Sequence, residues 1–149
     1  MAVIQNSVVI GRSPEAVFDY LSDPRSELEW NPKVEVMEKL SDGPLGVGTK
    51  FRAKWTKSKV VTMECTSYDR PRGWSYVNDG PVTVQLDIAL VDHADGTLLT
   101  SRFDAHPHGL FRLVFPVFMA MMRREEARNM QLLKKAVESR SNPSTAATS

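Results

Sequence analysis

The chain lacks the features by which several common classes of protein are identified. Among its 149 residues there is one cysteine, Cys65, so no intrachain disulfide and no zinc site made of several thiolates can form. This cysteine usage fits a reducing, cytoplasmic environment. The formal net charge of +1 provides no excess of basic residues to bind phosphates, which argues against nucleic acid as a partner.

Long hydrophobic segments are also missing. A membrane-spanning helix takes about 20 apolar residues. The apolar run from Leu110 to Met122 is shorter and contains Arg112 and Pro116, so we expect no transmembrane segment. The N-terminus lacks a basic stretch followed by a long apolar run, and we therefore expect no signal peptide.

Catalytic and metal-binding motifs are scarce as well. Of the three histidines, His93 lies in a turn and is interpreted as solvated, while His106 and His108 flank a proline and lack a recognisable third ligand. We therefore expect neither a metal nor another cofactor. The sequence holds no glycine-rich phosphate loop, nucleophile elbow or paired acidic motif. Cys65 lies on an alternating strand and is interpreted as a buried structural residue, because no histidine or cation is near it in sequence.

The N-terminal part of the chain predicts a strand followed by two short helices. Ala2 to Ile10 is rich in Val and Ile, as strands are. Ser13 then stands as an N-cap before Pro14, and the segment 22–30 repeats this pattern with Ser22 or Asp23 as the cap. The second helix should end before Asn31-Pro32, since a proline disfavours helical conformation in the residue before it.

The middle of the chain has the period-two alternation of strands that bury one face. Phe51, Ala53 and Trp55 alternate with basic residues, and the alternation recurs in segments 82–90 and 99–105. About six strands follow one another with only short turns between them, which indicates an antiparallel sheet. The whole order of elements is typical of an α+β fold with its helices at one side of a curved sheet.

A long helix is predicted at the C-terminal end. Its inward stripe follows spacings of three and four and consists of Met119, Met122, Glu126, Met130, Leu133 and Val137. Pro116 either opens this helix or kinks it near its start. Glu126 is a carboxylate within an apolar stripe, so it lies either at a solvated rim or against a cavity that admits polar groups. Residues 1–138 form one domain in this interpretation, and residues 139–149 a small, polar, disordered tail.

Several aromatic, sulfur-containing and polar side chains are expected to face inward, where they either pack the core or line a pocket. These candidates for ligand contact are Trp30, Phe51, Trp55, Met63, Trp74, Tyr76, Ser101, Phe103, Phe115, Met119, Met122, Glu126 and Met130. Methionine is a common core filler, and its flexible thioether also suits surfaces that adapt to varied apolar ligands. Tyr76 and Glu126 are the candidates for an acid or a base if a reaction is catalysed.

The order of these elements, together with several local phrases, resembles the polyketide cyclase/dehydrase branch of the START-like (SRPBCC) superfamily. The matching phrases are SPEAVFDYLSDP with EWNP, GVGTKF, SYDRPRGWSY, DGTLLTSRF and LLKKAVES, which together span Val3 to Glu138. The resemblance implies a helix-grip fold, in which a curved antiparallel sheet of about six or seven strands wraps around the long C-terminal helix. It also implies a deep hydrophobic cavity between sheet and helix, with the run from Leu110 to Met122 at its entrance and wall.

Three functions are open at this point, because a fold does not by itself select among them. The resemblance favours the binding of a hydrophobic or amphipathic small molecule, such as a lipid, polyketide, isoprenoid or quinone, for carriage, sensing or sequestration. The second function is a cyclase or dehydratase-type enzyme that acts on a ligand held in the same cavity. The third is a protein that forms a homodimer through the apolar start of its C-terminal helix, since exposed apolar surface usually marks a partner.

Overall fold

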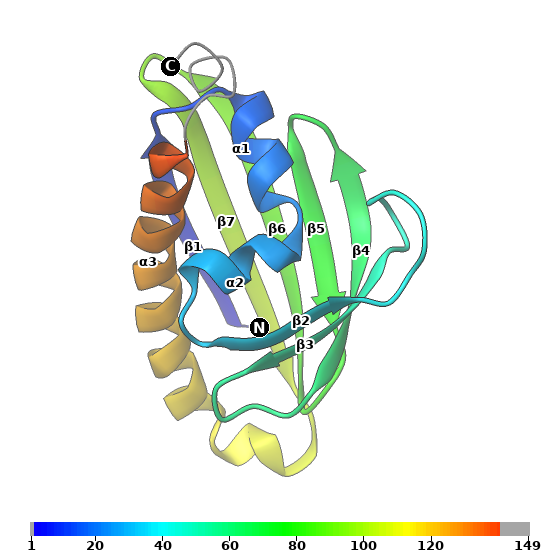
Figure 1. Cartoon of the computed structure of the whole chain (residues 1–149). Helices are drawn as coiled ribbons and strands as arrows, with labels where there is room; N and C mark the ends of the chain where they lie inside the picture. The colour runs from blue at the N-terminus through cyan, green and yellow to red at the C-terminus, as the bar shows by residue number, and fades with distance from the viewer. Residues whose placement is uncertain (1, 141–149) are drawn as a thin grey trace.

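The computed structural model describes residues 2–140 and consists of one sheet with its helices on one side (Figure 1). The elements follow in the order β1 (Ala2–Ile10), α1 (Pro14–Leu21), the 3-10 helix η1 (Pro24–Ser26), α2 (Glu27–Trp30), β2 (Val34–Lys39), β3 (Lys50–Trp55), β4 (Val61–Asp69), β5 (Gly73–Asn78), β6 (Val82–His93), β7 (Gly96–Pro107), the 3-10 helix η2 (Gly109–Leu113) and α3 (Phe115–Ser139). The predicted α+β class and helix-grip order are confirmed.

The sheet has seven strands in the order β1-β7-β6-β5-β4-β3-β2, and all neighbouring strands are antiparallel. The first strand pairs with the last, from Ala2 opposite Ala105 to Ile10 opposite Thr97. Because α3 follows β7 in the chain, this pairing brings β1 beside the long helix (Figure 1). The two ends of the domain therefore meet at one edge of the sheet.

The two short helices begin with the caps that the sequence predicts. The Ser13 side chain accepts a hydrogen bond from the backbone N–H of Ala16 at 3.3 Å. Asp23 caps η1 by accepting from the backbone N–H of Arg25 at 3.0 Å. Asn31 leaves the helical region with φ −104° and ψ 105°, so α2 ends ahead of the proline as expected.

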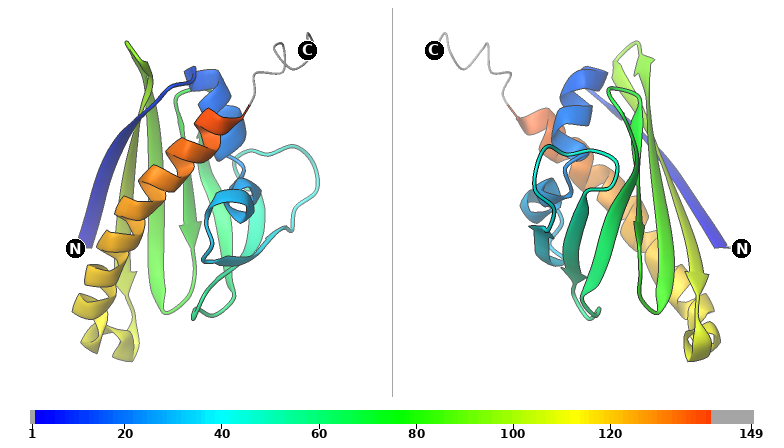
Figure 2. Two further views of the ribbon diagram at one scale, coloured as in Figure 1. Left: turned by 60° about the vertical axis from the view of Figure 1, so that its left-hand side comes forward. Right: turned by 90° about the vertical axis from the view of Figure 1, so that its right-hand side faces the viewer.

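Pro116 opens α3 rather than kinking it, because it is the second residue of that helix. The apolar run from Leu110 to Met122 is divided between η2 and the first turns of α3. The helix crosses one side of the sheet diagonally (Figure 2). It ends at Ser139, one residue into the expected tail, and residues 141–149 of that tail lie outside the described residues. Within residues 2–140, none of the helices combines the length and the apolar character that a membrane crossing requires.

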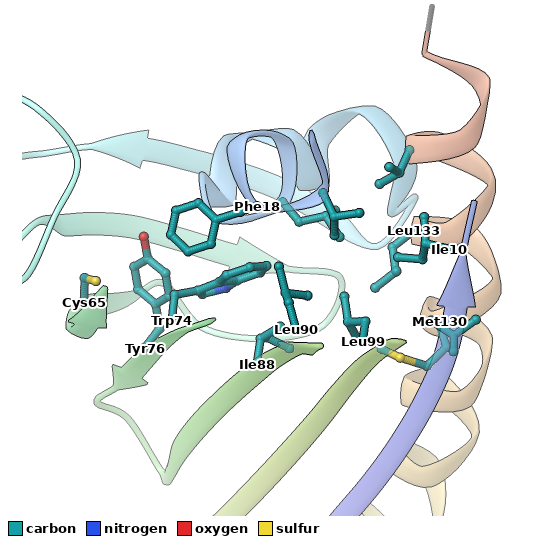
Figure 3. Close-up of a cluster of buried hydrophobic side chains, with 14 of the residues drawn as sticks. Ile10, Phe18, Cys65, Trp74, Tyr76, Ile88, Leu90, Leu99, Met130 and Leu133 are labelled. Atoms are coloured by element: carbon teal, nitrogen blue, oxygen red, sulfur yellow. The ribbon is translucent and has the colours of Figure 1, made fainter. Parts of the chain in front are cut away.

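The interior between the sheet and the helices consists of two groups of buried side chains. The larger group lies beneath α1 and the C-terminal half of α3, and Phe18 is central to it (Figure 3). The Phe18 ring meets those of Tyr68 and Trp74 edge to face, at centroid distances of 5.0 and 5.3 Å. The smaller group lies beneath the N-terminal half of α3 and includes Phe103 and Met119.

We expect the buried stripe of α3 to contribute much of the stability of the fold. Leu133→Ala should lower the free energy of unfolding by about 2–5 kcal/mol, because Leu133 is only 5% exposed and its truncation leaves a void. Leu113→Ala, at a site that is 80% exposed, is the matched control and should change it by less than about 0.5 kcal/mol. Urea unfolding measures both, and equal effects would contradict the docking of α3 through this stripe.

Candidate functional site

A cavity of about 80 Å³ lies between the sheet and the helices. Its lining consists of Leu21, Glu27, Trp30, Trp74, Leu86, Ile88, Leu99, Ser101, Glu126, Asn129, Met130 and Leu133. An apolar cavity of about 150 Å³ accommodates benzene, so this volume suits a few water molecules or one small chemical group. It is well below the roughly 300–1,000 Å³ of sites that enclose a drug-sized ligand.

Strands β5, β6 and β7 provide the floor of the cavity. Trp74 lies opposite Ile88, and Ile88 lies opposite Ser101, so these three residues form one row across the sheet. All three are buried, and Ser101 is only 1% exposed. Leu99 lies two residues before Ser101 on β7 and therefore on the same face. The floor is thus apolar except for the Ser101 hydroxyl.

The helices provide the remaining walls. Glu126, Asn129, Met130 and Leu133 follow one another at spacings that share one face of α3. Their arrangement places the acidic and amide groups nearer the start of the helix, and the two apolar residues nearer its end. Glu27 and Trp30 are three residues apart on α2 and close the opposite side. The polar part of the lining is therefore shared between two helices, α2 and α3.

Two carboxyl groups face this cavity, and both are harder to ionise than an ordinary glutamate. Burial raises the pKa of Glu126 from 4.5 to about 7, and the negative charges of Glu27 and Glu125 act in the same direction. Burial likewise raises the pKa of Glu27 from 4.5 to about 7, although hydrogen bonds with the side chains of Asn31 and Trp55 act against this. The Asn31 amide donates to Glu27 at 3.3 Å. Neither carboxyl group has a cationic neighbour among the described residues that would lower its pKa.

Two further polar atoms at the cavity are unpartnered. Trp30 Nε1 and Asn129 Oδ1 are both buried, and neither has a hydrogen-bond partner within residues 2–140. An unsatisfied buried polar atom costs about 1–3 kcal/mol, so such atoms tend to be satisfied by water or by a ligand. The cavity therefore combines an apolar floor with a donor and an acceptor that have no protein partner.

Five of the thirteen sequence candidates line this cavity, namely Trp30, Trp74, Ser101, Glu126 and Met130. Two positions were open for Glu126, a solvated rim or a cavity that admits polar groups, and the structure places it at the cavity. The other eight candidates pack in or against the two core groups instead. Phe51, Trp55, Met63 and Tyr76 belong with the larger group, and Phe103, Phe115, Met119 and Met122 with the smaller one.

Tyr76, the second candidate for an acid or base, does not line the cavity. Its hydroxyl donates a hydrogen bond to the backbone carbonyl of Ser22 at 3.0 Å. Burial raises the pKa of Tyr76 far above its usual value, so the phenol stays protonated. Its hydrogen bond instead ties β5 to the end of α1. Cys65 is buried as expected, with its thiol donating to the carbonyl of Ser67 at 3.3 Å.

Sequence reasoning missed two polar residues of the site, Glu27 and Asn129. Glu27 lies in a short segment with no helical period long enough to assign an inward face. Asn129 is three residues after Glu126, and that spacing was the available signal, because residues three apart share a helix face. The apolar lining residues Leu86 and Leu99 belong to the alternating segments 82–90 and 99–105, whose period predicts a buried face without assigning either residue to a site.

A second, wider depression of about 820 Å³ lies where α1 and η1 approach the end of α3. Its charged groups already have partners within the protein, such as Arg70 for Asp19 and backbone carbonyls for Arg12. Arg25 pairs with Asp23 at 2.7 Å, and Arg140 pairs with Glu29 at 3.4 Å while it stacks over the Tyr20 ring at 4.3 Å. Among the described residues that line this depression, Ser26 Oγ is the only buried side-chain polar atom without a hydrogen-bond partner. We therefore take the smaller cavity as the candidate site.

The apolar start of the C-terminal helix is exposed. Leu110, Leu113 and Val117 are 84%, 80% and 74% exposed, which is unusual for side chains of this kind. None of the three is among the lining residues of the cavity. Dimerisation through this surface stays a prediction.

Comparisons with known proteins agree with this architecture. A family model described as polyketide cyclase / dehydrase and lipid transport matches residues 1–138. Among solved structures, the protein TTHA0849 from Thermus thermophilus is 16% identical with a TM-score of 0.78, covering 94% of this chain and 99% of its own. The Zhui aromatase/cyclase from Streptomyces sp. R1128 is 15% identical with a TM-score of 0.72, covering 95% and 96%.

The Aha1 dimer from Colwellia psychrerythraea is 16% identical with a TM-score of 0.68, and covers 93% of this chain and 98% of its own. At such identities these likenesses establish the helix-grip fold and leave the ligand and the chemistry undefined. No curated protein is significantly similar to the chain in sequence.

The raised pKa of Glu126 predicts an unusual dependence of stability on pH. Between about pH 4.5 and 7, Glu126 keeps its proton in the folded state and has lost it in the unfolded chain. The contribution of this proton to the free energy of unfolding is therefore full below about pH 4.5 and is lost as the pH rises through about 7. Glu126→Gln should therefore stabilise the protein at pH 8, by up to about 3 kcal/mol, and change it little at pH 5.

Thermal unfolding of both proteins at the two pH values measures this effect. Glu15→Gln, at an exposed position on α1, is the matched control and should be neutral at both. A variant Glu126→Gln that is destabilised equally at pH 5 and pH 8 would show that the carboxylate is ionised and satisfied in the folded state.

Proposed function

The chain belongs to the polyketide cyclase/dehydrase and lipid transport family, and we propose that it binds a small molecule with an apolar body and one polar end. The observation that supports this proposal is the cavity between the sheet and α3. Its floor is apolar, and yet Trp30 Nε1 and Asn129 Oδ1 at its walls have no partner among the described residues. Such a combination of apolar surface with a few convergent polar groups is typical of ligand sites.

The two parts of the lining have different roles in this proposal. The row of Trp74, Ile88 and Ser101, together with Leu99 and Leu133, supplies apolar contact, worth roughly 25 cal/mol per Å² of surface removed from water. The carboxyl, amide and indole groups of α2 and α3 orient the polar end of the ligand. Only the apolar contribution increases with the length of the ligand.

A ligand as large as a lipid or a polyketide requires a larger space than about 80 Å³. The short helix α2 is the wall that moves at the lowest cost, because none of its four residues is fully buried. An outward shift of α2 widens the cavity, keeps Glu27 and Trp30 on the wall that recedes, and leaves the floor of the sheet unchanged. Entry between α2 and α3 is therefore part of the proposal.

An enzyme of the cyclase or dehydratase type is the second candidate function. It is favoured by the pKa values of Glu27 and Glu126, both about 7, since a general base is most effective when its pKa lies near the working pH. In such a reaction Glu126 removes a proton from the carbon next to a carbonyl group of the bound substrate. Tyr76 has no part in this version, because its hydroxyl is bound to Ser22.

Ligand binding is tested with a series of neutral alcohols from 1-butanol to 1-octanol. Each added CH₂ group should contribute up to about 0.8 kcal/mol to the binding free energy measured by calorimetry. Ser101→Leu fills the cavity and should weaken the binding of 1-hexanol by about tenfold or more, which is about 1.4 kcal/mol. Thr100→Leu, one residue earlier on the opposite face of β7, is the matched control and should leave it unchanged.

Native mass spectrometry of the purified protein provides an independent measurement of any retained ligand. An absence of binding along the whole alcohol series, or equal binding by the two leucine variants, would contradict the proposal. Circular dichroism establishes that both variants are folded before their affinities are compared.

The enzyme candidate is tested by solvent deuterium exchange into a β-keto thioester, followed by mass spectrometry. Exchange at the carbon between the two carbonyl groups should be faster with the protein than without it. Its rate should rise as the pH passes through about 7, because only the ionised Glu126 accepts a proton. Glu126→Gln should abolish the acceleration while 1-hexanol still binds, and an unchanged exchange rate in this variant would eliminate the candidate.

A further inference from the structure

Hydrogen-bond acceptors converge on the cavity from two helices without a cation to balance them. Glu27 reaches it from α2, and Glu126 and Asn129 reach it from adjacent positions on α3. Glu126 is only 9% exposed, and the Asn129 amide oxygen is buried without a hydrogen-bond partner among the described residues. Within residues 2–140, the lining contains no lysine, arginine or histidine.

The rest of the lining also suits a positively charged group. Two tryptophans, Trp30 and Trp74, border the cavity, and an indole ring is the best aromatic partner for a cation. The remaining residues of the floor are uncharged, with Ile88 and Leu99 supplying apolar surface and Ser101 a hydroxyl group that can also accept a hydrogen bond. A positive group with an apolar body therefore finds an acceptor for each donor and an apolar surface beside it.

We propose that the cavity binds the protonated amino group of an otherwise apolar amine, with the carboxylates of Glu27 and Glu126 as counter-ions and the Asn129 amide oxygen as a third acceptor. A primary ammonium group has three N–H donors and no acceptor, which matches these three acceptors in number. This inference rests on the proposed function for the apolar part of the ligand. It adds the chemical class of the polar end.

Other polar ends fit less well. A carboxylate or phosphate would be repelled by Glu27 and Glu126. A hydroxyl group has a single donor and no charge, so it would leave the repulsion between the two carboxylates unbalanced. A divalent metal ion is bound by a larger set of carboxylate or imidazole ligands, and no three His, Cys, Asp or Glu residues come together for this purpose in the described part of the chain.

The charges around the site predict how amine binding depends on pH. The groups that act on Glu126 are Glu27 on α2 and Glu125 on its own helix, while the sheet contributes only uncharged residues to the cavity. Between pH 5 and pH 8 both glutamates lose their protons, because both pKa values are about 7. An alkylamine keeps its charge over this range, since its pKa is about 10 like that of lysine. Amine affinity should therefore rise with pH.

The experiment compares three ligands with the same chain and different polar ends, namely hexylamine, 1-hexanol and hexanoate, by calorimetry with the full chain. At pH 8 we expect hexylamine to bind at least about tenfold more tightly than 1-hexanol, a difference of about 1.4 kcal/mol, and hexanoate to bind most weakly. At pH 5 the preference for hexylamine over 1-hexanol should fall to less than about threefold, since both carboxyl groups are then protonated.

Variants locate the effect. Glu27→Gln and Glu126→Gln should each reduce the preference for hexylamine over 1-hexanol at pH 8, and the double variant should bring it below about threefold. Glu29→Gln, next to α2's cavity face but directed to Tyr20 and Arg140, is the matched control and should keep the preference. A preference that persists in the double variant would place the amine elsewhere on the protein and would overturn the inference.

The remaining outcomes separate the two proposals. If 1-hexanol binds and hexylamine binds no better at pH 8, the inference about the amine is wrong and the proposed function stands. If none of the three ligands binds, the proposed function fails and the inference fails with it. Thermal unfolding shows that each variant is folded, and Glu126→Gln is expected to be at least as stable as the unmodified chain at pH 8.

Discussion

The apolar face of the antiparallel sheet must be covered from water, and the rest of the structure depends on how α1 and α3 cover it. Phe18 from α1 and Leu133 from α3 both pack over the same face of the sheet, above Trp74 and Leu99 (Figure 3). The burial of these side chains is the main stabilising contribution that the fold has available. The helix α3 follows β7 in the chain, and β7 pairs with β1. The N-terminal strand β1 therefore lies against α3 and helps to hold the helix on the sheet.

That packing explains why the candidate site has the composition it has. Glu126 belongs to the same stripe of α3 as Met130 and Leu133, so docking the apolar residues carries the carboxyl group into the interior with them. The cost of burying it is reduced by protonation, which is the physical meaning of a pKa near 7. A carboxyl group in this condition responds strongly to any cation or proton acceptor that enters the cavity.

The floor of the cavity and the wall that α2 forms differ in how firmly they are held. Trp74, Ile88 and Ser101 lie on three adjacent strands and are fixed by the hydrogen bonds of the sheet. Glu27 and Trp30 lie on a helix of four residues that has no fully buried side chain. A rigid apolar floor opposite a lightly held polar wall is an arrangement that can adapt to ligands of different length. This difference, more than the small volume of the cavity, supports the proposed binding of a small molecule.

The sequence alone determined the order of elements, because that order is governed by local signals. Ser13 and Asp23 cap helices through contacts within three residues, and period-two alternation assigned Leu99, Ser101 and Phe103 to the buried face of one strand. The same reasoning placed Glu126 on the inward stripe of α3. It could not separate residues that line the cavity from those that fill the core, since Ser101 and Phe103 have the same period and differ only in what lies opposite them.

Only the tertiary structure decided which inward residues form a site. Glu27 and Glu126 are far apart in the chain, and they share a cavity because α2 and α3 contact each other and both border the residues of β5, β6 and β7 that line it. Phe51, Tyr76 and Met119 face inward as well, but other side chains surround them and close the space. Local periodicity specifies the face on which a side chain lies, whereas a cavity depends on the distances between elements that are remote in sequence, and no local pattern encodes those distances.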